Sequence, residues 1–435
     1  MINDLNNTTK QNDNNLEYNC DIVIDSKRTQ MPITNENIFD YEEIFCDNFN
    51  GFNTEDGEYL LASVQDRISK CDVELAQGIL EIYEDGFGHL YLNKPICGNE
   101  KIFVPPKVVK YFDLRNADAV FGTIAQDIKT GTLVMVMANK IDGVIINPKH
   151  KRPNFDKLLP IYPKEKFNLC TPNSQISLKL LDLILPIAIG QRALIIAPPN
   201  SGVTNLIIDI LNNIKHYHQN SKMVVLLSNK RPEEVTDMEQ NVDAEIYVCN
   251  YEDKIERNLM KAQIAIERCK RLVEGGFDAV LVVDSLTSIA RSYNLIASPS
   301  GKMLYGWFDL MVFNSLKQYF GYARNVEGKG SLTIFAILTE SDEEVDKKIY
   351  NELKSISNME LHLQPLQQDD ELEIDWTKSY ALRQSDILDS QHLLCIKEIR
   401  KNLINSPTYI DELKSIVKSH IANADIINFI LNKTK

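Results

Sequence analysis

From residue 175 to its end, the chain alternates continuous apolar runs with amphipathic stretches, and this rhythm constrains the fold more than any other feature. The apolar runs are ALIIA, MVVLLS, AVLVVD and SLTIFAIL, at residues 193–197, 223–228, 279–284 and 331–338. Continuous apolar strands between helices predict a parallel sheet with helices on both faces. Ligands of such sheets lie beyond the carboxyl ends of the strands. We therefore expect functional residues just after Ala197, Ser228, Asp284 and Leu338.

The loop after the first strand departs from the phosphate-binding loop, whose pattern is G-x-x-x-x-G-K-[ST]. Here the loop is APPNSGVT, from Ala197 to Thr204, and Val203 stands at the lysine position. Its context is still that of a phosphate-loop domain, because an amphipathic helix follows it and a second strand ends in Asp284, the type of residue that holds Mg²⁺. The residues predict a degenerate phosphate loop. An ordinary strand-to-helix turn, with Asp284 as a helix N-cap, is the alternative.

A different pattern occupies residues 77–147. Short β-branched or aromatic runs, such as GILEIYE, KIFV, AVFGTI and TLVMVMA, are separated there by Gly, Asn, Asp and Pro. This pattern predicts a small β-barrel of the OB-fold or cold-shock type. Residues 148–174 are rich in Pro and Lys and predict a linker. Residues 175–435 are then the α/β domain, with further helices at its C-terminal end.

Charge and composition bound the remainder of the chain. Residues 1–60 contain 13 acidic and three basic residues, so they carry −10 of the net charge of −14. We expect residues 1–58 to be a largely disordered, Asn-rich leader and residues 59–76 to contain a short helix. No apolar stretch is long enough for a membrane span or a secretory signal. The eight cysteines lack the C-x-x-C pairs of zinc sites, and we expect a cytoplasmic protein that contacts no membrane.

Several longer runs are specific enough to indicate a family. RPEEVTDM, VVDSLTSIARSYN and NMELHL in the α/β region, and GILEIYEDGFGHLYL in the barrel region, resemble the bacterial transcription termination factor Rho. The resemblance extends over residues 77–435. It implies an OB-type RNA-binding domain followed by a RecA-like ATPase domain, with ATP and Mg²⁺ held between the subunits of a ring. It also implies single-stranded RNA as a partner, a homo-hexamer or co-assembly with another Rho, and contact with RNA polymerase.

The resemblance assigns the RNA-binding positions. Phe87 and Phe103 fall on aromatic residues that stack on RNA bases in the family, and His89 stands where the family usually has another Phe. Lysine and arginine side chains nearby supply phosphate contacts, and Lys354 matches a lysine that contacts RNA in the central hole of the ring. The phosphate-contacting candidates are Lys101, Lys107, Lys110 and Arg115. Phe87 and Phe103 as plain barrel core are the alternative.

The resemblance also assigns the nucleotide-binding positions, and here the chain departs from the family. The loop residues are Pro199, Asn200, Ser201, Gly202, Val203 and Thr204. The family loop ends in Gly-Lys-Thr, so Val203 replaces one lysine and Asn200 replaces a second. Lys230 replaces the Glu that orients the attacking water. The family's adenine-stacking aromatic residue is lost, since ELEID at residues 371–375 stands in its place.

Other catalytic positions are kept. Thr204 and Asp284 retain the family's Mg²⁺ ligands, and Arg231 retains the arginine beside the lost Glu. The arginine finger, which acts across the subunit boundary, is Arg383 if one residue is inserted and Leu382 if none is. The expected function is that of a Rho-like RNA-binding ring protein in transcription termination or its regulation, with impaired ATP hydrolysis. An active RNA translocase and an interaction module without RNA binding are the alternatives.

Overall fold

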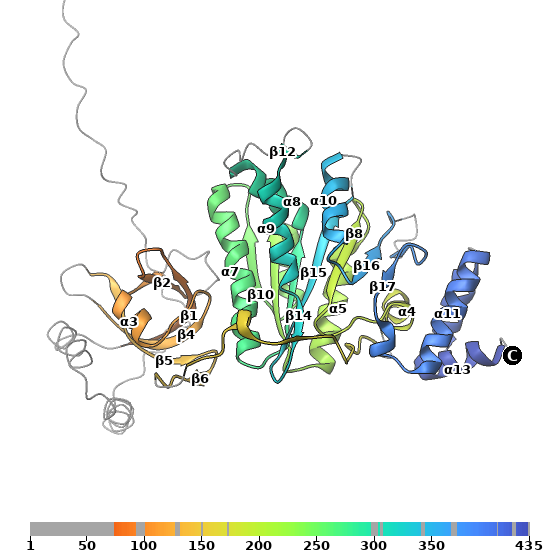
Figure 1. Ribbon diagram of the computed structural model, residues 1–435, viewed down its shortest axis with the longest axis horizontal. Helices are drawn as coiled ribbons and strands as arrows, with labels where there is room; N and C mark the ends of the chain where they lie inside the picture. The colour runs from red at the N-terminus through yellow and green to blue at the C-terminus, as the bar shows by residue number, and fades with distance from the viewer. Residues whose placement is uncertain are drawn as a thin grey trace, which may run out of the picture.

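The computed structural model describes residues 74–92, 101–126, 131–148, 151–171, 174–296, 303–304, 308–340, 344–366, 372–406, 408–419 and 423–433. A small β-barrel is followed along the chain by a larger α/β domain (Figure 1). The expected leader and the helix expected before residue 74 lie outside the described residues. The first strand begins at Glu74, before the predicted boundary at residue 77. None of the described helices is long and apolar enough to cross a membrane.

The barrel is built from short strands whose apolar side chains alternate between its inside and its outside. Its sheet has the order β3-β2-β1-β4-β5-β6, and a contact between β3 and β5 closes it. The interior is filled by residues such as Leu80, Leu90, Ile102, Val120 and Ile124. The elements are β1 (Glu74–Ile82), β2 (Gly88–Tyr91), β3 (Lys101–Val104), α3 (Pro106–Tyr111), β4 (Ala119–Gln126), β5 (Leu133–Ile141) and β6 (Val144–Ile145).

The larger domain confirms the predicted parallel sheet. Its main strands run in the order β10-β9-β11-β15-β8-β16, all parallel, with β17 antiparallel at one edge. The four predicted runs form β8, β9, β11 and β15, and these strands are continuously apolar because helices cover both faces. The strands are β8 (Arg192–Ala197), β9 (Lys222–Ser228), β10 (Glu245–Cys249), β11 (Ala279–Asp284), β15 (Ser331–Thr339), β16 (Met359–His362) and β17 (Tyr380–Ala381).

Two apolar clusters, one on each face of the sheet, make the core of this domain. One contains residues of α4 (Ile176–Ile184), α5 (Val203–Tyr217), α6 (Pro232–Asn241), α11 (Ser390–Asn405), α12 (Tyr409–Ser419) and α13 (Asn423–Lys433). The other contains residues of α7 (Ile255–Glu274), α8 (Leu286–Ile296), α9 (Leu310–Gly321) and α10 (Glu344–Lys354). A two-stranded ribbon, β12 (Met303–Leu304) with β13 (Phe308–Asp309), completes the described strands of this region.

The segment between the barrel and the α/β domain packs along the second unit as an extended strap. It contains η1 (Phe155–Lys157) and β7 (Pro160–Ile161), and β7 pairs with β14 (Arg324–Val326) at the edge of the large sheet. Phe155 is fully buried, and its backbone N–H donates a 2.8 Å hydrogen bond to Glu274 on α7. Tyr91 and Ala117 of the barrel join the same apolar cluster as Phe155. The barrel is therefore anchored to α7.

Candidate nucleotide pocket and RNA interface

The predicted nucleotide-binding residues do gather at the carboxyl edge of the parallel sheet. The loop after β8 carries Asn200 with φ 59° and Gly202 with φ 72°, the left-handed conformation that turns the chain into α5. Pro199 and Asn200 are exposed, Thr204 is half-buried, and Ser201 is 1% exposed. The Ser201 hydroxyl has no hydrogen-bond partner in the described part of the chain. The loop thus has the path of a phosphate loop but not its cation.

Lys230 and Asp284 form a buried ion pair at this edge. The Lys230 ammonium lies 2.9 Å from the Asp284 carboxylate and 3.8 Å from that of Glu234. Asp284 is 3% exposed, because β11 is the central strand between β9 and β15. Burial raises the pKa of the Asp284 carboxyl, although the neighbouring ammonium acts to lower it. Lys230 therefore directly neutralises the carboxylate that was predicted to hold a metal.

Apolar side chains lie over the phosphate loop itself. The backbone N–H of Leu366 donates a 2.9 Å hydrogen bond to the Asn200 carbonyl. A Cβ built on Gly202 would meet side-chain atoms of Leu366 and Leu372 at 3.5 Å. Val203 and Leu372 pack against the same apolar cluster. Val203, which stands at the position of the family's lysine, therefore takes part in apolar packing.

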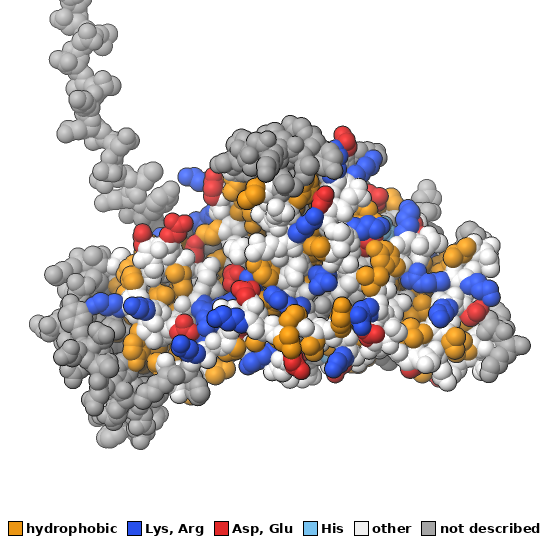
Figure 2. Space-filling view, in the orientation of Figure 1, with side chains coloured by type: hydrophobic (Ala, Val, Ile, Leu, Met, Phe, Trp, Pro, Cys, Tyr) orange, Lys and Arg blue, Asp and Glu red, His pale blue; other side chains and the backbone are white. Residues whose placement is uncertain are grey.

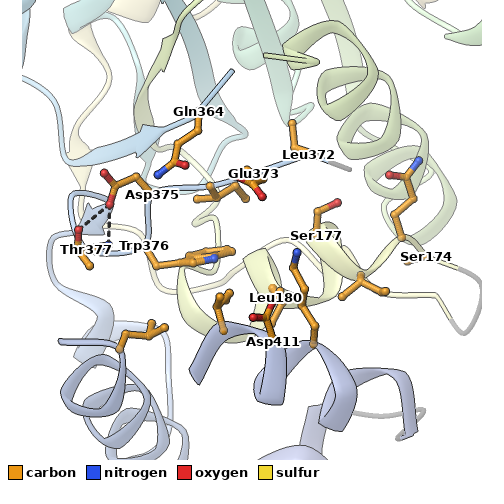
Figure 3. A pocket seen from close by; sticks show the side chains of 16 residues that line it. Ser174, Ser177, Leu180, Gln364, Leu372, Glu373, Asp375, Trp376, Thr377 and Asp411 are labelled. Carbon is orange, nitrogen blue, oxygen red and sulfur yellow. Dashed lines mark hydrogen bonds between the residues drawn. The ribbon is translucent and has the colours of Figure 1, made fainter. Parts of the chain in front are cut away.

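A cavity of about 620 Å³ lies between α4, α12 and the segment 372–377, and the residues that line it do not include those of the loop after β8. Figure 3 shows the Trp376 ring on its floor, with Glu373 and Leu372 above it and Asp375 turned aside toward Thr377. The predicted loss of the family's aromatic residue falls on Glu371, outside the described residues. Trp376, which is 6% exposed and belongs to the apolar core, lines this cavity, and the sequence analysis did not single it out. In the sequence, the only sign of this aromatic side chain was the tryptophan at the end of the run EIDW, residues 373–376.

The residues at the sheet edge do not fit a Mg²⁺ ion as they stand. A magnesium site needs a free carboxylate or hydroxyl oxygen facing the ion, and the Asp284 carboxylate faces an ammonium instead. Among the described residues no group of three His, Cys, Asp or Glu side chains has the spacing of a metal site. Thr204 keeps its hydroxyl, but one half-buried hydroxyl is not a metal site. The same edge keeps a loop shape suited to a nucleotide.

Four aromatic rings form a cluster on the outside of the barrel, at the turn between β1 and β2, on β2 and on β3. His89 and Phe103 are cross-strand partners, and the Phe87 ring lies 5.7 Å from each of theirs. All three are half-buried and none belongs to the barrel core, so the plain-core alternative is wrong. Tyr83 stacks on Phe87 with centroids 4.9 Å apart and ring planes at 21°. We call these four residues the aromatic cluster.

The base of the aromatic cluster is polar and well ordered by hydrogen bonds. The Glu81 carboxylate, 4% exposed, accepts hydrogen bonds of 2.8 Å from the hydroxyls of both Tyr83 and Tyr91. Burial, followed by the charge of Lys101, lowers the pKa of His89, so its ring is neutral at pH 7. Lys101 is exposed beside the cluster. Half-exposed rings next to a cation are the usual platform for single-stranded nucleic acid.

The sequence analysis did not identify Tyr83, because this residue lies just past the end of β1. There the alternation of side chains along a strand no longer predicts which way a side chain points. Its N–H donates a 2.9 Å hydrogen bond to the Phe87 carbonyl, which sets the two rings face to face across the turn. An aromatic residue four positions before Phe87 in a tight hairpin was the available signal.

Arg115, which the sequence analysis proposed as a phosphate contact, instead forms ion pairs with Glu274 at 3.2 Å and with Asp113 at 3.0 Å.

The remaining predicted residues lie apart from these two sites within one subunit. Lys354 ends α10, with its side chain 47% exposed, and its ammonium contacts Tyr350 at 2.9 Å and Glu360 at 3.6 Å. Arg383 lies beyond β17, pairs with Asp386 at 2.6 Å and lies over the Tyr162 ring. Arg231 is exposed at the N-cap of α6. Arg383 is about half exposed, whereas Leu382 carries no charge.

Two family models match the two regions of the chain described above. The nucleotide-binding domain of the ATP synthase alpha/beta family matches residues 177–380, and the RNA-binding domain of Rho termination factor matches residues 76–144. The ATPase of a bacterial type III secretion system has a similar structure, with a TM-score of 0.53, 19% identity, and 68% of this chain and 94% of that chain covered. At this identity the likeness shows the fold alone, and it confirms the predicted ATPase-type α/β domain.

Curated relatives are closer in sequence. Transcription termination factor Rho of Bacillus subtilis (strain 168) is 32% identical over 381 residues, which cover 86% of this chain and 89% of the relative. Rho of Escherichia coli (strain K12) is 34% identical over 350 residues, covering 78% and 83%. Rho of Thermotoga maritima is 38% identical over 293 residues, covering 66% and 68%. With these matches over most of both chains, the protein belongs to the family of the bacterial transcription termination factor Rho.

Proposed function

We propose that this chain is an RNA-binding factor of the Rho family that acts in transcription termination or its regulation, and that its ATP hydrolysis is impaired. The aromatic cluster supports RNA binding, since its rings are half-exposed beside Lys101. The observation that carries the impaired hydrolysis is the 2.9 Å ion pair between Lys230 and Asp284. It places an ammonium where a phosphoryl-transfer site needs a metal ligand and a water-orienting carboxylate.

The size of the expected effect follows from general catalysis. One preorganised group that stabilises developing charge is worth about 2.7 to 4 kcal/mol, or roughly a hundredfold to a thousandfold in rate. This chain lacks the loop lysine at Val203, lacks the water-orienting carboxylate at Lys230, and has neutralised Asp284. Such losses are not additive. A reduction of at least about a thousandfold in hydrolysis is still the expected outcome.

Lys230 itself is the argument for the second candidate, an active RNA translocase. An ammonium on the neighbouring strand could in principle replace the lost loop lysine. Its position speaks against that role, because it is held by Asp284 and lies near Glu234, and its side chain is only 19% exposed. To bind a phosphate, the ammonium would have to leave the buried Asp284 carboxylate without its partner, which is costly.

Phosphate release from ATP, with and without single-stranded RNA, tests the proposal. The wild-type protein should show no RNA-stimulated release above background. Val203→Lys combined with Lys230→Glu restores the family's residues and should raise release at least tenfold if the remainder of the pocket is intact. The matched control, Val144→Lys with Lys329→Glu, makes the same two changes at exposed positions and should leave phosphate release unchanged. RNA-stimulated turnover of about 1 s⁻¹ or faster in the wild type would contradict the proposal.

Assembly and RNA binding are tested separately. We propose a homo-hexamer or co-assembly with another Rho subunit, and mass measurement in solution distinguishes them. RNA polymerase and a cytoplasmic setting belong to the same proposal, through the family's role in termination. Failure to bind cytidine-rich single-stranded RNA at low salt would favour the third reading, an interaction module without RNA binding.

A further inference from the structure

A positively charged cleft lies where the barrel meets the strap. Its volume is about 610 Å³, and it is open to solvent between the end of α3, Pro148 and residues 151–158. Figure 2 shows Lys and Arg side chains along this junction. The side chains that matter for its chemistry are those of Lys110, Tyr111, Arg115, Lys151, Arg152 and Lys157. The only carboxylate that lines it is that of Asp113.

The two arginines build the walls of the cleft and are committed to protein partners. Arg115 donates hydrogen bonds to the Pro153 carbonyl at 2.7 Å and to Glu274 at 3.2 Å. Arg152 donates two hydrogen bonds of 2.8 Å to the Asp118 carboxylate, which is fully buried. These contacts fix the strap against the barrel. The cleft therefore has a rigid shape, which a binding surface needs.

The three lysines, in contrast, are exposed and without a carboxylate partner. Lys110, Lys151 and Lys157 all lie on the surface, and within the described part of the chain no carboxylate pairs with them. These three lysines give the cleft a positive charge, although the chain as a whole has a net charge of −14. Tyr111 adds a partly exposed ring to the same cleft. Cations beside an aromatic face are suited to a phosphodiester backbone and its bases.

The cleft and the aromatic cluster lie at opposite ends of α3. Phe103 precedes this helix on β3, and Pro106 at its start lies beside Gly86 of the turn that carries Phe87. Lys110 and Tyr111 are its last residues. The helix has six residues, so the two sites are separated by roughly 9 Å of helix. A strand whose bases stack on the cluster needs only a few more nucleotides to reach the cleft.

We propose that this cleft is a second contact site for single-stranded RNA, in which Lys110, Lys151 and Lys157 bind backbone phosphates of the strand that leaves the aromatic cluster. The inference rests on the proposed RNA binding by the barrel. It predicts that the protein holds a longer strand than the aromatic cluster alone accommodates. It also gives the strap a role in RNA binding besides its role as a connection.

The test uses the full chain, two oligocytidine RNAs of about 4 and about 12 nucleotides, and the triple variant Lys110→Gln, Lys151→Gln, Lys157→Gln. Each phosphate contact to a single strand contributes about 0.7 to the slope of log affinity against log salt. On the longer RNA, the magnitude of that slope should be smaller by about 2 for the variant than for the wild type. Between 50 and 200 mM salt, wild-type affinity should then fall about twentyfold more than that of the variant. Binding of the shorter RNA should not change.

A matched variant, Lys397→Gln, Lys401→Gln, Lys418→Gln, removes three exposed lysines from α11 and α12 and should leave both RNAs unaffected. An unchanged salt slope on the longer RNA would overturn the inference, as would an equal loss on both lengths. If the wild type binds neither RNA, the proposed RNA binding by the barrel is wrong, and the inference about the cleft is wrong with it. Phe103→Ala, which should weaken both lengths alike, separates a failure of the aromatic cluster from a failure of the cleft.

Discussion

At the scale of single residues, charge and packing at the proposed nucleotide site are consistent with one another. Lys230 lies 2.9 Å from the buried Asp284 carboxylate, so the two side chains form an ion pair. Leu366 and Leu372 lie over the loop that carries Val203. A buried carboxylate needs such a partner if the site is to stay folded.

Removing the ammonium tests whether Lys230 now has a structural role. Lys230→Met leaves the Asp284 carboxylate buried without a partner, so we expect the free energy of unfolding to fall by about 3 kcal/mol at pH 8. Burial already raises the pKa of this carboxyl, and losing the ammonium raises it further. The deficit should therefore shrink as the pH falls through that raised pKa, because protonation removes the buried charge. Urea unfolding at pH 8 and at pH 5.5 measures it.

The double variant Lys230→Met with Asp284→Asn is the control for that experiment. It removes both charges, so most of the lost stability should return, and the pH dependence of the deficit should disappear. Equal destabilisation by the single and the double variant would show that packing, and not charge, is what Lys230 provides.

Tyr83 supports a prediction on RNA binding. It stacks on Phe87 and is held by Glu81, so it extends the ring surface that a base can contact. Tyr83→Ala should weaken binding of single-stranded RNA by about 1 to 3 kcal/mol, whereas Tyr83→Phe, which keeps the ring, should cost much less. Fluorescence anisotropy with a labelled oligocytidine checks both. Tighter binding by Tyr83→Ala would mean that Tyr83 occupies the position of a base.

At the scale of elements, what the sequence predicts depends on how local the cause is. The strands that end at Ala197, Ser228 and Asp284 were predictable because continuous apolar runs are a local signal of buried parallel strands. The path of residues 148–174 was not, because β7 pairs with β14, more than 150 positions further along the chain. The Lys230–Asp284 pair needed the strand order, since β9 and β11 are neighbours only in space. The resemblance to the Rho family indicated that Val203 and Lys230 depart from its pattern, but it could not show which residues their side chains contact.

β16 at the edge of the parallel sheet carries a buried carboxylate whose ionisation can be measured. Glu360 is fully buried and accepts hydrogen bonds from Tyr380 at 2.5 Å and Tyr350 at 2.9 Å. Burial alone would raise the pKa of Glu360, but its bonds with His362, Tyr380 and Tyr350 outweigh burial and hold the pKa at about 2. The unfolded chain titrates near 4.5. This carboxylate therefore stabilises the fold above pH 4.5, and that contribution is lost as the pH falls toward 2.

Glu360→Gln should remove this contribution. We expect the variant to be less stable than the wild type at pH 7, with the difference narrowing below about pH 4.5 as the wild-type carboxylate protonates. Chemical unfolding at several pH values between 7 and 3 measures the difference. A constant difference across that range would mean that the charge of Glu360 does not contribute. Glu352→Gln, in a partly exposed pair with Lys317, should change stability little at any of these pH values.

At the scale of the whole molecule, the barrel and the α/β domain are joined by buried charge as well as by apolar packing. Arg268 on α7 is 4% exposed, contacts Asp142 of the barrel, and donates a 2.8 Å hydrogen bond to Glu245 on β10. Glu274 at the end of the same helix binds Arg115 of the barrel and the N–H of Phe155. One helix thus fixes the barrel, the strap and the sheet relative to one another.

Arg268 is the residue through which this coupling can be tested. Arg268→Met leaves two carboxylates, Asp142 and Glu245, without their cation, so the free energy of unfolding should fall by about 3 to 5 kcal/mol. Because the lost contact lies between the two units, the barrel should then unfold before the α/β domain, and calorimetry should show two transitions where the wild type shows one. Arg383→Met, which breaks an exposed pair with Asp386, should cost at most about 1 kcal/mol. If Arg268→Met unfolds in a single transition with unchanged midpoint, the contacts that remain, which include the Arg115–Glu274 pair and the apolar contacts of Tyr91 and Phe155, are enough to hold the two units together.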